Sequence, residues 1–420
     1  MKKLSILVVA AMLCLIALPA FAQDKADWAF YGSVRMWTSW EDWDQNAPSA
    51  VNFGAPSTKR SGSWSSGTNK FDDSDLWWGM QYNARIGANV KWGNVGGRFE
   101  YGHLNSEGSG TGNDTAHVRL LYGDWNFGPG VLRIGQDYTP YFYTISQQCG
   151  PSNGDCSGIG FGSLYGGRKD QVKLIMGGFQ FALIEPQVTT AGLRPAAWVT
   201  TSSLAPADSN LPPDTDRTIP KIEASYNFNL GPANIFIGGG YNTFDAVYVV
   251  NNAEKEVSVD SYGIGIGAKV PIGPFYVNGA FQWSQNPGNY GFGLNQPFLL
   301  TTLTGDTNPA NTDDTEDLDV WSGAIVLGFN LTSTFNVEAG WFHVNFDGKT
   351  SAGIGGAPFG RDASAKLDAY YIMANWSPAK NVFISPELGL IDFGEAEFDN
   401  SPDVDLGDMW YFGIKWMINF

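Results

Sequence analysis

Five arginines lie in segments where apolar and polar residues alternate, and each directly precedes an apolar residue. Successive residues of a strand point to opposite faces, so these arginines share the face opposite the apolar residues. They are Arg35, Arg85, Arg98, Arg119 and Arg133. If the apolar faces point outward, the arginines form a ladder on one wall of an enclosed interior. Such a wall attracts anions and repels cations. The alternative is that the interior is simply polar and the arginines lie at different heights.

A long polar connection, residues 139–168, supplies the other candidates for this interior. It opens with the aromatic residues Tyr141, Phe142 and Tyr143, along which a sugar could slide. Acidic residues in and beside the connection are fewer than a strongly cation-selective passage needs. Together with an inward glutamate, the candidates for the lining are Glu100, Asp137, Tyr141, Tyr143 and Arg168.

Other chemistry has weak support in the sequence. There is no G-x-S-x-G motif, and His103, His117 and His343 lack ligand spacing. We therefore expect no enzyme activity, no cofactor and no metal centre. Acidic clusters in the long connections could bind Ca²⁺, although solvated loop charges explain them better. The formal charge of -17 makes nucleic acid an implausible partner.

The first 22 residues predict export. Lys2 and Lys3 precede an apolar stretch too short to anchor a protein in a membrane, and Ala20-Phe21-Ala22 forms a cleavage site. Removal of residues 1–22 as a signal peptide changes the formal charge from -17 to -19. In an oxidising compartment we expect a Cys149–Cys156 disulfide, worth about 2–3 kcal/mol. A metal site is the weaker alternative, because no histidine lies nearby.

The elements that position these residues are long strands. Residues 76–92 alternate between apolar and polar for far longer than the roughly 5–6 residues usual in a globular strand. The apolar face has Trp78 near one end and Trp92 at the other, as two membrane interfaces require. The composition agrees, with 52 Gly, 27 Phe and 16 Trp but only 16% charged residues.

Short and long connections between the predicted strands alternate along the chain. The seven short turns are expected at Gly93-Asn94, Gly128-Pro129-Gly130, Gly177-Gly178, Gly231-Pro232, Ile272-Gly273-Pro274, Thr332-Ser333 and Ser377-Pro378. The eight long connections are residues 42–75, 104–116, 139–168, 188–217, 246–257, 287–316, 347–364 and 395–406. Sixteen antiparallel strands result, and they must close into one transmembrane barrel, residues 23–420, because lipid leaves no backbone group unpaired. A secreted β-sandwich is the minor alternative.

The last strand carries Trp416, Ile418 and Phe420 on its apolar face. This ending resembles that of outer-membrane barrel proteins, whose final strand is recognised by the barrel-assembly machinery. A narrower resemblance lies at residues 134–140, Ile-Gly-Gln-Asp-Tyr-Thr-Pro, which are similar to the strand before the third loop of the general porins of Gram-negative bacteria.

Membership of that family implies an outer-membrane homotrimer in contact with lipid and lipopolysaccharide. It also implies that the third loop, residues 139–168, folds inward and sets the constriction. Small hydrophilic solutes and ions would then diffuse passively through the barrel. Two other functions stay open: a channel specific for a sugar or carboxylate, and a non-conducting surface adhesin or structural barrel.

Overall fold

The computed structural model describes residues 26–45, 71–81, 83–104, 115–150, 164–188, 214–250, 253–292, 299–300, 302–303, 315–350, 362–399 and 402–420. The predicted signal peptide, residues 1–22, and Cys156 lie outside these ranges. Within them, no helix is both long enough and apolar enough to cross a membrane.

The described chain is almost entirely β-structure. The long strands are β1 (Asp27–Gln45), β2 (Phe71–Met80), β3 (Arg85–Trp92), β4 (Val95–Leu104), β5 (Thr115–Asn126), β6 (Val131–Tyr138), β9 (Arg168–Met176), β10 (Phe179–Ile184), β12 (Lys221–Leu230), β13 (Ala233–Val250), β14 (Ala253–Ile272), β15 (Phe275–Gln285), β19 (Asp319–Asn330), β20 (Phe335–Thr350), β21 (Asp362–Ala379), β22 (Val382–Asp392) and β25 (Asp408–Asn419). The short elements are β7 (Phe142–Tyr143), β8 (Leu164–Tyr165), β11 (Asp214–Asp216), α3 (Pro287–Tyr290), β16 (Leu299–Leu300), β17 (Thr302–Leu303), β18 (Thr315–Glu316), β23 (Glu395–Phe398) and β24 (Val404–Asp405).

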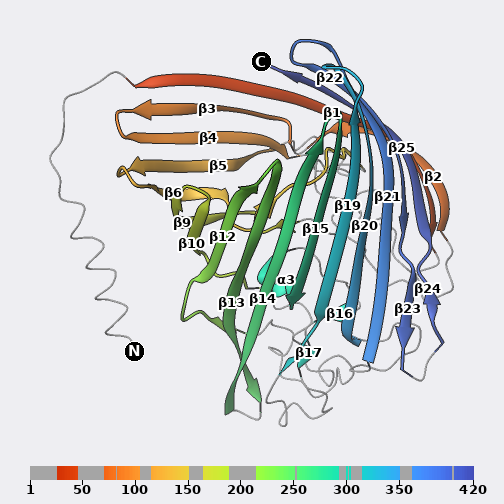
Figure 1. Ribbon diagram of the computed structural model, residues 1–420. Helices are drawn as coiled ribbons and strands as arrows, with labels where there is room; N and C mark the ends of the chain where they lie inside the picture. Colours follow the sequence, from red (N-terminus) through yellow and green to blue (C-terminus); the bar gives the residue numbers. More distant parts are fainter. Residues whose placement is uncertain are drawn as a thin grey trace.

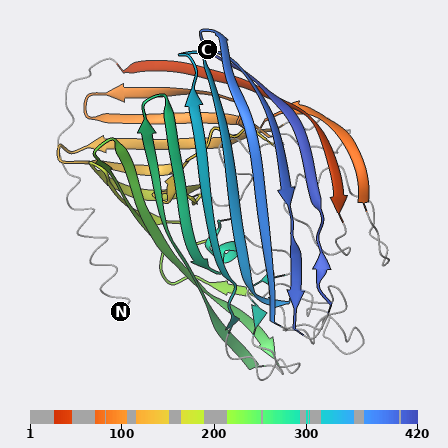
Figure 2. The same cartoon turned by 45° about the vertical axis from the view of Figure 1, so that its right-hand side comes forward.

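The sheet closes on itself through β1. One edge of β1 pairs with β25, from Ser33 opposite Asn419 to Asp44 opposite Asp408. The other edge pairs with β3 and then with β2, which together form one interrupted strand. Neighbouring strands are antiparallel throughout, and they wrap around the molecule from the red β1 to the blue β25 (Figures 1 and 2). The predicted closed sixteen-stranded antiparallel barrel is confirmed, and the β-sandwich alternative is wrong.

The two faces of the barrel differ in polarity. The outer face carries large exposed apolar side chains, among them Phe30 (75%), Trp78 (69%) and Ile264 (56%). The inner face carries buried polar residues such as Asn242, Gln282 and Ser322. Exposing large apolar side chains is unfavourable in water, but it is favourable on a surface that faces lipid. The alternation read from the sequence is therefore the alternation between lipid and interior.

The structure changes two details of the strand prediction. Residues 76–92 are not one uninterrupted strand: after Met80 the chain turns at Gln81, whose N–H donates to the Arg35 carbonyl (3.0 Å).

The predicted turn at Ser377-Pro378 lies within β21, and the chain reverses two residues later, at residues 380–381. Pro378 is tolerated because the pairing with β22 shifts register between Trp376 and Ala379. Asn381 makes the turn with φ of 66°, which asparagine accepts readily.

A bulge in β5 changes a third detail. Opposite β4, Glu100 pairs with Leu120 and Tyr101 pairs with Val118, so Arg119 is the extra residue. At this bulge the assignment of residues to the inner and outer faces shifts by one position. Leu120, expected on the outer face, is only 2% exposed, while Leu121 is 55% exposed.

Candidate channel lumen

Three of the five predicted arginines converge on one carboxylate, Glu100. Arg119 Nε lies 2.7 Å from Glu100 Oε1, and Arg98 Nη2 lies 2.8 Å from Oε2. Arg85 Nε is 3.7 Å from Oε2, which also accepts a hydrogen bond from the Tyr31 hydroxyl (2.8 Å). The side chains of Glu100 and Arg119 are each 1% exposed, whereas Arg85 is 24% and Arg98 is 31% exposed. The cluster therefore leaves Arg85 and Arg98 partly exposed and buries Arg119.

Arg133 belongs to a second ion-paired group. Its guanidinium lies between Asp124 (Nε–Oδ1, 2.7 Å) and Asp137 (Nη1–Oδ2, 2.6 Å), above the Tyr122 ring at 3.7 Å. Lys173 Nζ approaches the same Asp137 oxygen at 2.5 Å. Two cations and two carboxylates thus largely offset one another. Asp137 lies one residue before the end of β6, from which the third loop leaves the wall.

Arg35, the fifth arginine of the predicted ladder, lies apart from these groups, and so does the loop-end candidate Arg168. Arg35 donates from Nε to Ser33 Oγ (2.9 Å) and lines a cavity beside the β19–β20 turn. Arg168, where the loop returns to the wall, has its guanidinium carbon 5.7 Å from the centre of the Tyr138 ring. The five arginines of the predicted ladder therefore divide among three surroundings. Only β3 and β4 bring two of them to one carboxylate with their side chains still partly exposed.

The third loop crosses the interior and is held there by its backbone. Residues 139–150, yellow in Figure 2, contact inward residues of strands far apart in the sequence. Three glutamates accept hydrogen bonds from loop N–H groups. The bonds run from Tyr141 to Glu223 of β12 (2.9 Å), from Gln147 to Glu338 of β20 (2.7 Å) and from Cys149 to Glu387 of β22 (2.6 Å). The loop is thus attached to three strands of the barrel wall.

Tyrosine hydroxyls complete the environment of these glutamates. The donors are Tyr290 to Glu223 (3.0 Å), Tyr276 and Tyr371 to Glu338 (2.6 Å each), and Tyr411 to Glu387 (2.6 Å). All three glutamates are at most 2% exposed. A buried carboxylate is stable only with such partners. The sequence analysis missed them. Alternation alone places each on the inner face, but nothing local shows that a loop binds there.

The loop tyrosines are packed rather than open to the interior. Tyr141 is 0% and Tyr143 is 5% exposed. The Tyr141 hydroxyl donates to Gln282 (3.0 Å), and the Tyr143 ring stacks on Phe236 with centroids 5.0 Å apart. Burial raises the pKa of Tyr143 to about 12, so its hydroxyl remains a neutral donor. This packing differs from the aromatic track suggested by the sequence, because both rings anchor the loop to the wall.

Cys149 is also buried in this region. Its side chain belongs to the apolar cluster of the interior, and its carbonyl accepts a hydrogen bond from Gln81 Nε2 (3.1 Å). The Cys149–Cys156 disulfide remains a prediction, because Cys156 lies outside the described residues.

The chain end lies against the start of β1. Gly32 and Phe420 exchange two backbone hydrogen bonds (2.7 and 3.0 Å). Trp416, Ile418 and Phe420 are 42%, 54% and 68% exposed on the outer face. Their proposed recognition by the assembly machinery stays a prediction. Among the described residues, no group of three or more His, Cys, Asp or Glu side chains is placed to hold a metal ion.

A closed sixteen-stranded barrel with an apolar exterior, a polar interior and an infolded loop has the fold of an outer-membrane porin. Solved structures bear this out. The outer membrane channel DcaP of Acinetobacter baumannii is 15% identical, with a TM-score of 0.59 over 96% of this chain and 100% of that one.

Two other solved structures are similar over 94% of this chain and 100% of their own, each with a TM-score of 0.51. They are the trimer form of the outer membrane protein OmpT of Vibrio cholerae, 14% identical, and an anion-selective porin from Comamonas acidovorans, 12% identical. No family model and no curated protein sequence matches the chain. The fold is therefore that of an outer-membrane channel.

Proposed function

We propose that this protein is a porin of the Gram-negative outer membrane, through which small hydrophilic solutes and ions diffuse passively. The observation that carries the proposal is the third-loop segment 139–150, fixed inside a closed barrel by Glu223, Glu338 and Glu387. An adhesin does not require a loop segment that is hydrogen-bonded to the inner face of three strands. A passage, in contrast, needs an aperture of fixed size.

The proposed mechanism combines aperture and charge. The third loop, of which the structure describes residues 139–150 and 164–168, is proposed to form the constriction and to set its width. Arg85 and Arg98 supply the accessible positive charge on one side, where an ion must pass and screening by salt is weakest. No step requires a cofactor or catalysis.

We further propose that the protein works as a homotrimer, as the general porins that it resembles do. The trimer form of OmpT, with a similar fold, supports this assembly. The exposed apolar band would contact lipid and lipopolysaccharide, and Phe420 would mark the last strand for the assembly machinery.

The proposal is tested by reconstituting the protein in liposomes and in planar bilayers. We expect stable ionic conductance and swelling by sugars that declines smoothly with sugar size. Absence of both would refute the porin proposal and favour the structural barrel. Swelling by a single solute would instead favour a channel specific for a sugar or carboxylate.

A further inference from the structure

Three alternate glycines of β14 form a flat patch on the inner face of the barrel. Gly263, Gly265 and Gly267 are buried, and they alternate with isoleucines that are exposed on the outer face. The neighbouring strand β13 extends the patch, because it places Gly240 opposite Gly263 and Gly238 opposite Gly265. A glycine inside a strand weakens it, and it often marks a place where another group approaches the backbone closely. The run of glycines therefore indicates that something packs on this wall.

Each of the three β14 glycines makes room for one aromatic side chain. A Cβ atom at Gly263 would lie 2.5 Å from Cε2 of Phe292, which is too close for two carbon atoms. The same atom at the next two glycines would overlap Tyr141 and Tyr143 of the third loop, respectively. Any larger residue at these positions would therefore push the rings away from the wall.

The rings form a continuous layer over this patch. The ring centroids of Tyr290 and Phe292 are 4.0 Å apart, and those of Phe292 and Tyr141 are 4.9 Å apart. Phe236 of β13 continues the layer, 6.4 Å from Tyr141 and 5.0 Å from Tyr143. Aromatic rings at such separations attract one another beyond the effect of their burial. The layer thus joins the third loop to the segment that carries α3.

Two of these rings belong to residues 286–292, which contain α3 and lie inside the barrel against β13 and β14 (Figure 1). Tyr290 of this segment is 0% exposed. Its hydroxyl donates to Glu223 Oε1 (3.0 Å), and its carbonyl accepts from Lys221 Nζ (2.9 Å). The other oxygen of Glu223 accepts from the N–H of Tyr141 (2.9 Å). One buried carboxylate therefore holds both the segment and the third loop.

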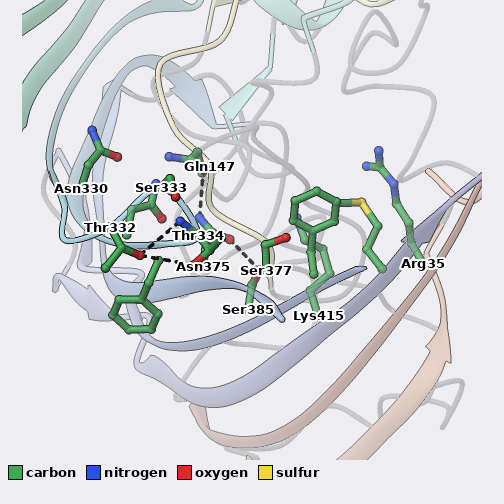
Figure 3. A pocket seen from close by; sticks show the side chains of 14 residues that line it. Arg35, Gln147, Asn330, Thr332, Ser333, Thr334, Asn375, Ser377, Ser385 and Lys415 are labelled. Carbon is green, nitrogen blue, oxygen red and sulfur yellow. Dashed lines mark hydrogen bonds between the residues drawn. The ribbon is translucent and has the colours of Figure 1, made fainter. Parts of the chain in front are cut away.

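The later part of the third-loop stretch 139–150 is held separately. Gln147 donates from its N–H to Glu338 (2.7 Å), and its Oε1 accepts from Asn375 Nδ2 (3.0 Å) (Figure 3). These two partners belong to β20 and β21 rather than to β13 and β14. The aromatic layer and Glu223 thus hold the first part of the loop.

We propose that residues 286–292 are a second infolded segment of the channel, which narrows the passage and fixes the first part of the third loop in place. Phe292 is the positioning residue, because its ring lies between Tyr290 of its own segment and Tyr141 of the loop. The inference rests on the proposed porin function and adds to it a second segment that bounds the aperture. The start of the long connection 287–316 is then as much a part of the aperture as the third loop.

Hydrogen–deuterium exchange of the detergent-solubilised protein, read by mass spectrometry, measures how firmly the loop is held. In Phe292→Ala, we expect the Tyr141 N–H to exchange about tenfold faster, because the loop loses an aromatic contact and the burial that goes with it. Gly263→Ala should act in the same way, since its added methyl group displaces the Phe292 ring. The double variant should stay within about twofold of Phe292→Ala, because no ring is then left to displace.

Two controls separate this effect from general loosening. The Gln147 N–H, which is held by Glu338, should exchange as in the wild type in every variant. Gly323→Ala adds the same methyl group on β19, where a Cβ atom would lie an ordinary 3.8 Å from the Ala280 carbonyl oxygen. It should leave exchange and conductance unchanged. Each variant is confirmed as a folded barrel by its heat-modifiable mobility on gels.

Single-channel recording and liposome swelling with the same variants test the passage itself. In Phe292→Ala we expect larger conductance and entry of sugars that the wild type excludes. Unchanged exchange at Tyr141, equal acceleration at Gln147, or wild-type conductance in Phe292→Ala would each overturn the inference. So would an effect of Gly263→Ala that is undiminished in the double variant. A wild type that does not conduct refutes the porin proposal instead, and the exchange measurement then decides whether the segment positions the loop.

Discussion

Replacing Glu338 with glutamine should release the third loop from one wall of the barrel. Its carboxylate accepts from the Gln147 N–H (2.7 Å), from Ser146 Oγ (3.1 Å) and from the hydroxyls of Tyr276 and Tyr371 (2.6 Å each). An amide keeps one acceptor oxygen and places an NH₂ group against the other donors. Each buried donor left unsatisfied costs about 1–3 kcal/mol. Two of them weaken this attachment by roughly 3 kcal/mol, so states with this part of the loop detached become about 100-fold more populated.

Single-channel recording and liposome swelling measure this change. We expect larger, noisier conductance and entry of sugars that the wild type excludes. Glu395→Gln, at an exposed position of β23, is the control and should behave as wild type. Wild-type conductance and the same sugar cutoff in the Glu338 variant would show that the loop does not define the aperture.

Three further predictions concern charge, stability and covalent structure. Replacing Arg85 and Arg98 together with glutamine should move the reversal potential toward cations in a salt gradient; an unmoved potential would place them away from the ion path. Arg119→Met leaves a buried carboxylate short of a partner and should lower the free energy of unfolding in urea by about 3–5 kcal/mol, which tryptophan fluorescence would detect. Mass mapping of non-reduced protein should find Cys149 joined to Cys156, and free thiols at both would exclude the bond.

The sequence by itself determined the strands and their closure. Alternation with period two is a local property, visible in residues 76–92 without any partner strand. Short turns are local as well, because Gly93 and Gly231 adopt positive φ at their turns (59° each). A lipid-facing sheet with no tolerable edge must then close. Alternation, short turns and closure together predicted the barrel. The same alternation places Arg35, Arg85, Arg98 and Arg133 on the inner face, whereas a bulge interrupts it at Arg119.

Only the tertiary structure decided which inward side chains meet. Gln147 and Glu338 are separated by 191 positions, and no local pattern relates them. Their contact depends on strand register around the barrel and on the path of the third loop. The bulge at Arg119, whose side chain forms the buried ion pair with Glu100, is equally invisible in the alternation. Periodicity assigns a residue to a face, whereas contacts across the interior depend on how the whole sheet closes and where the loop crosses it.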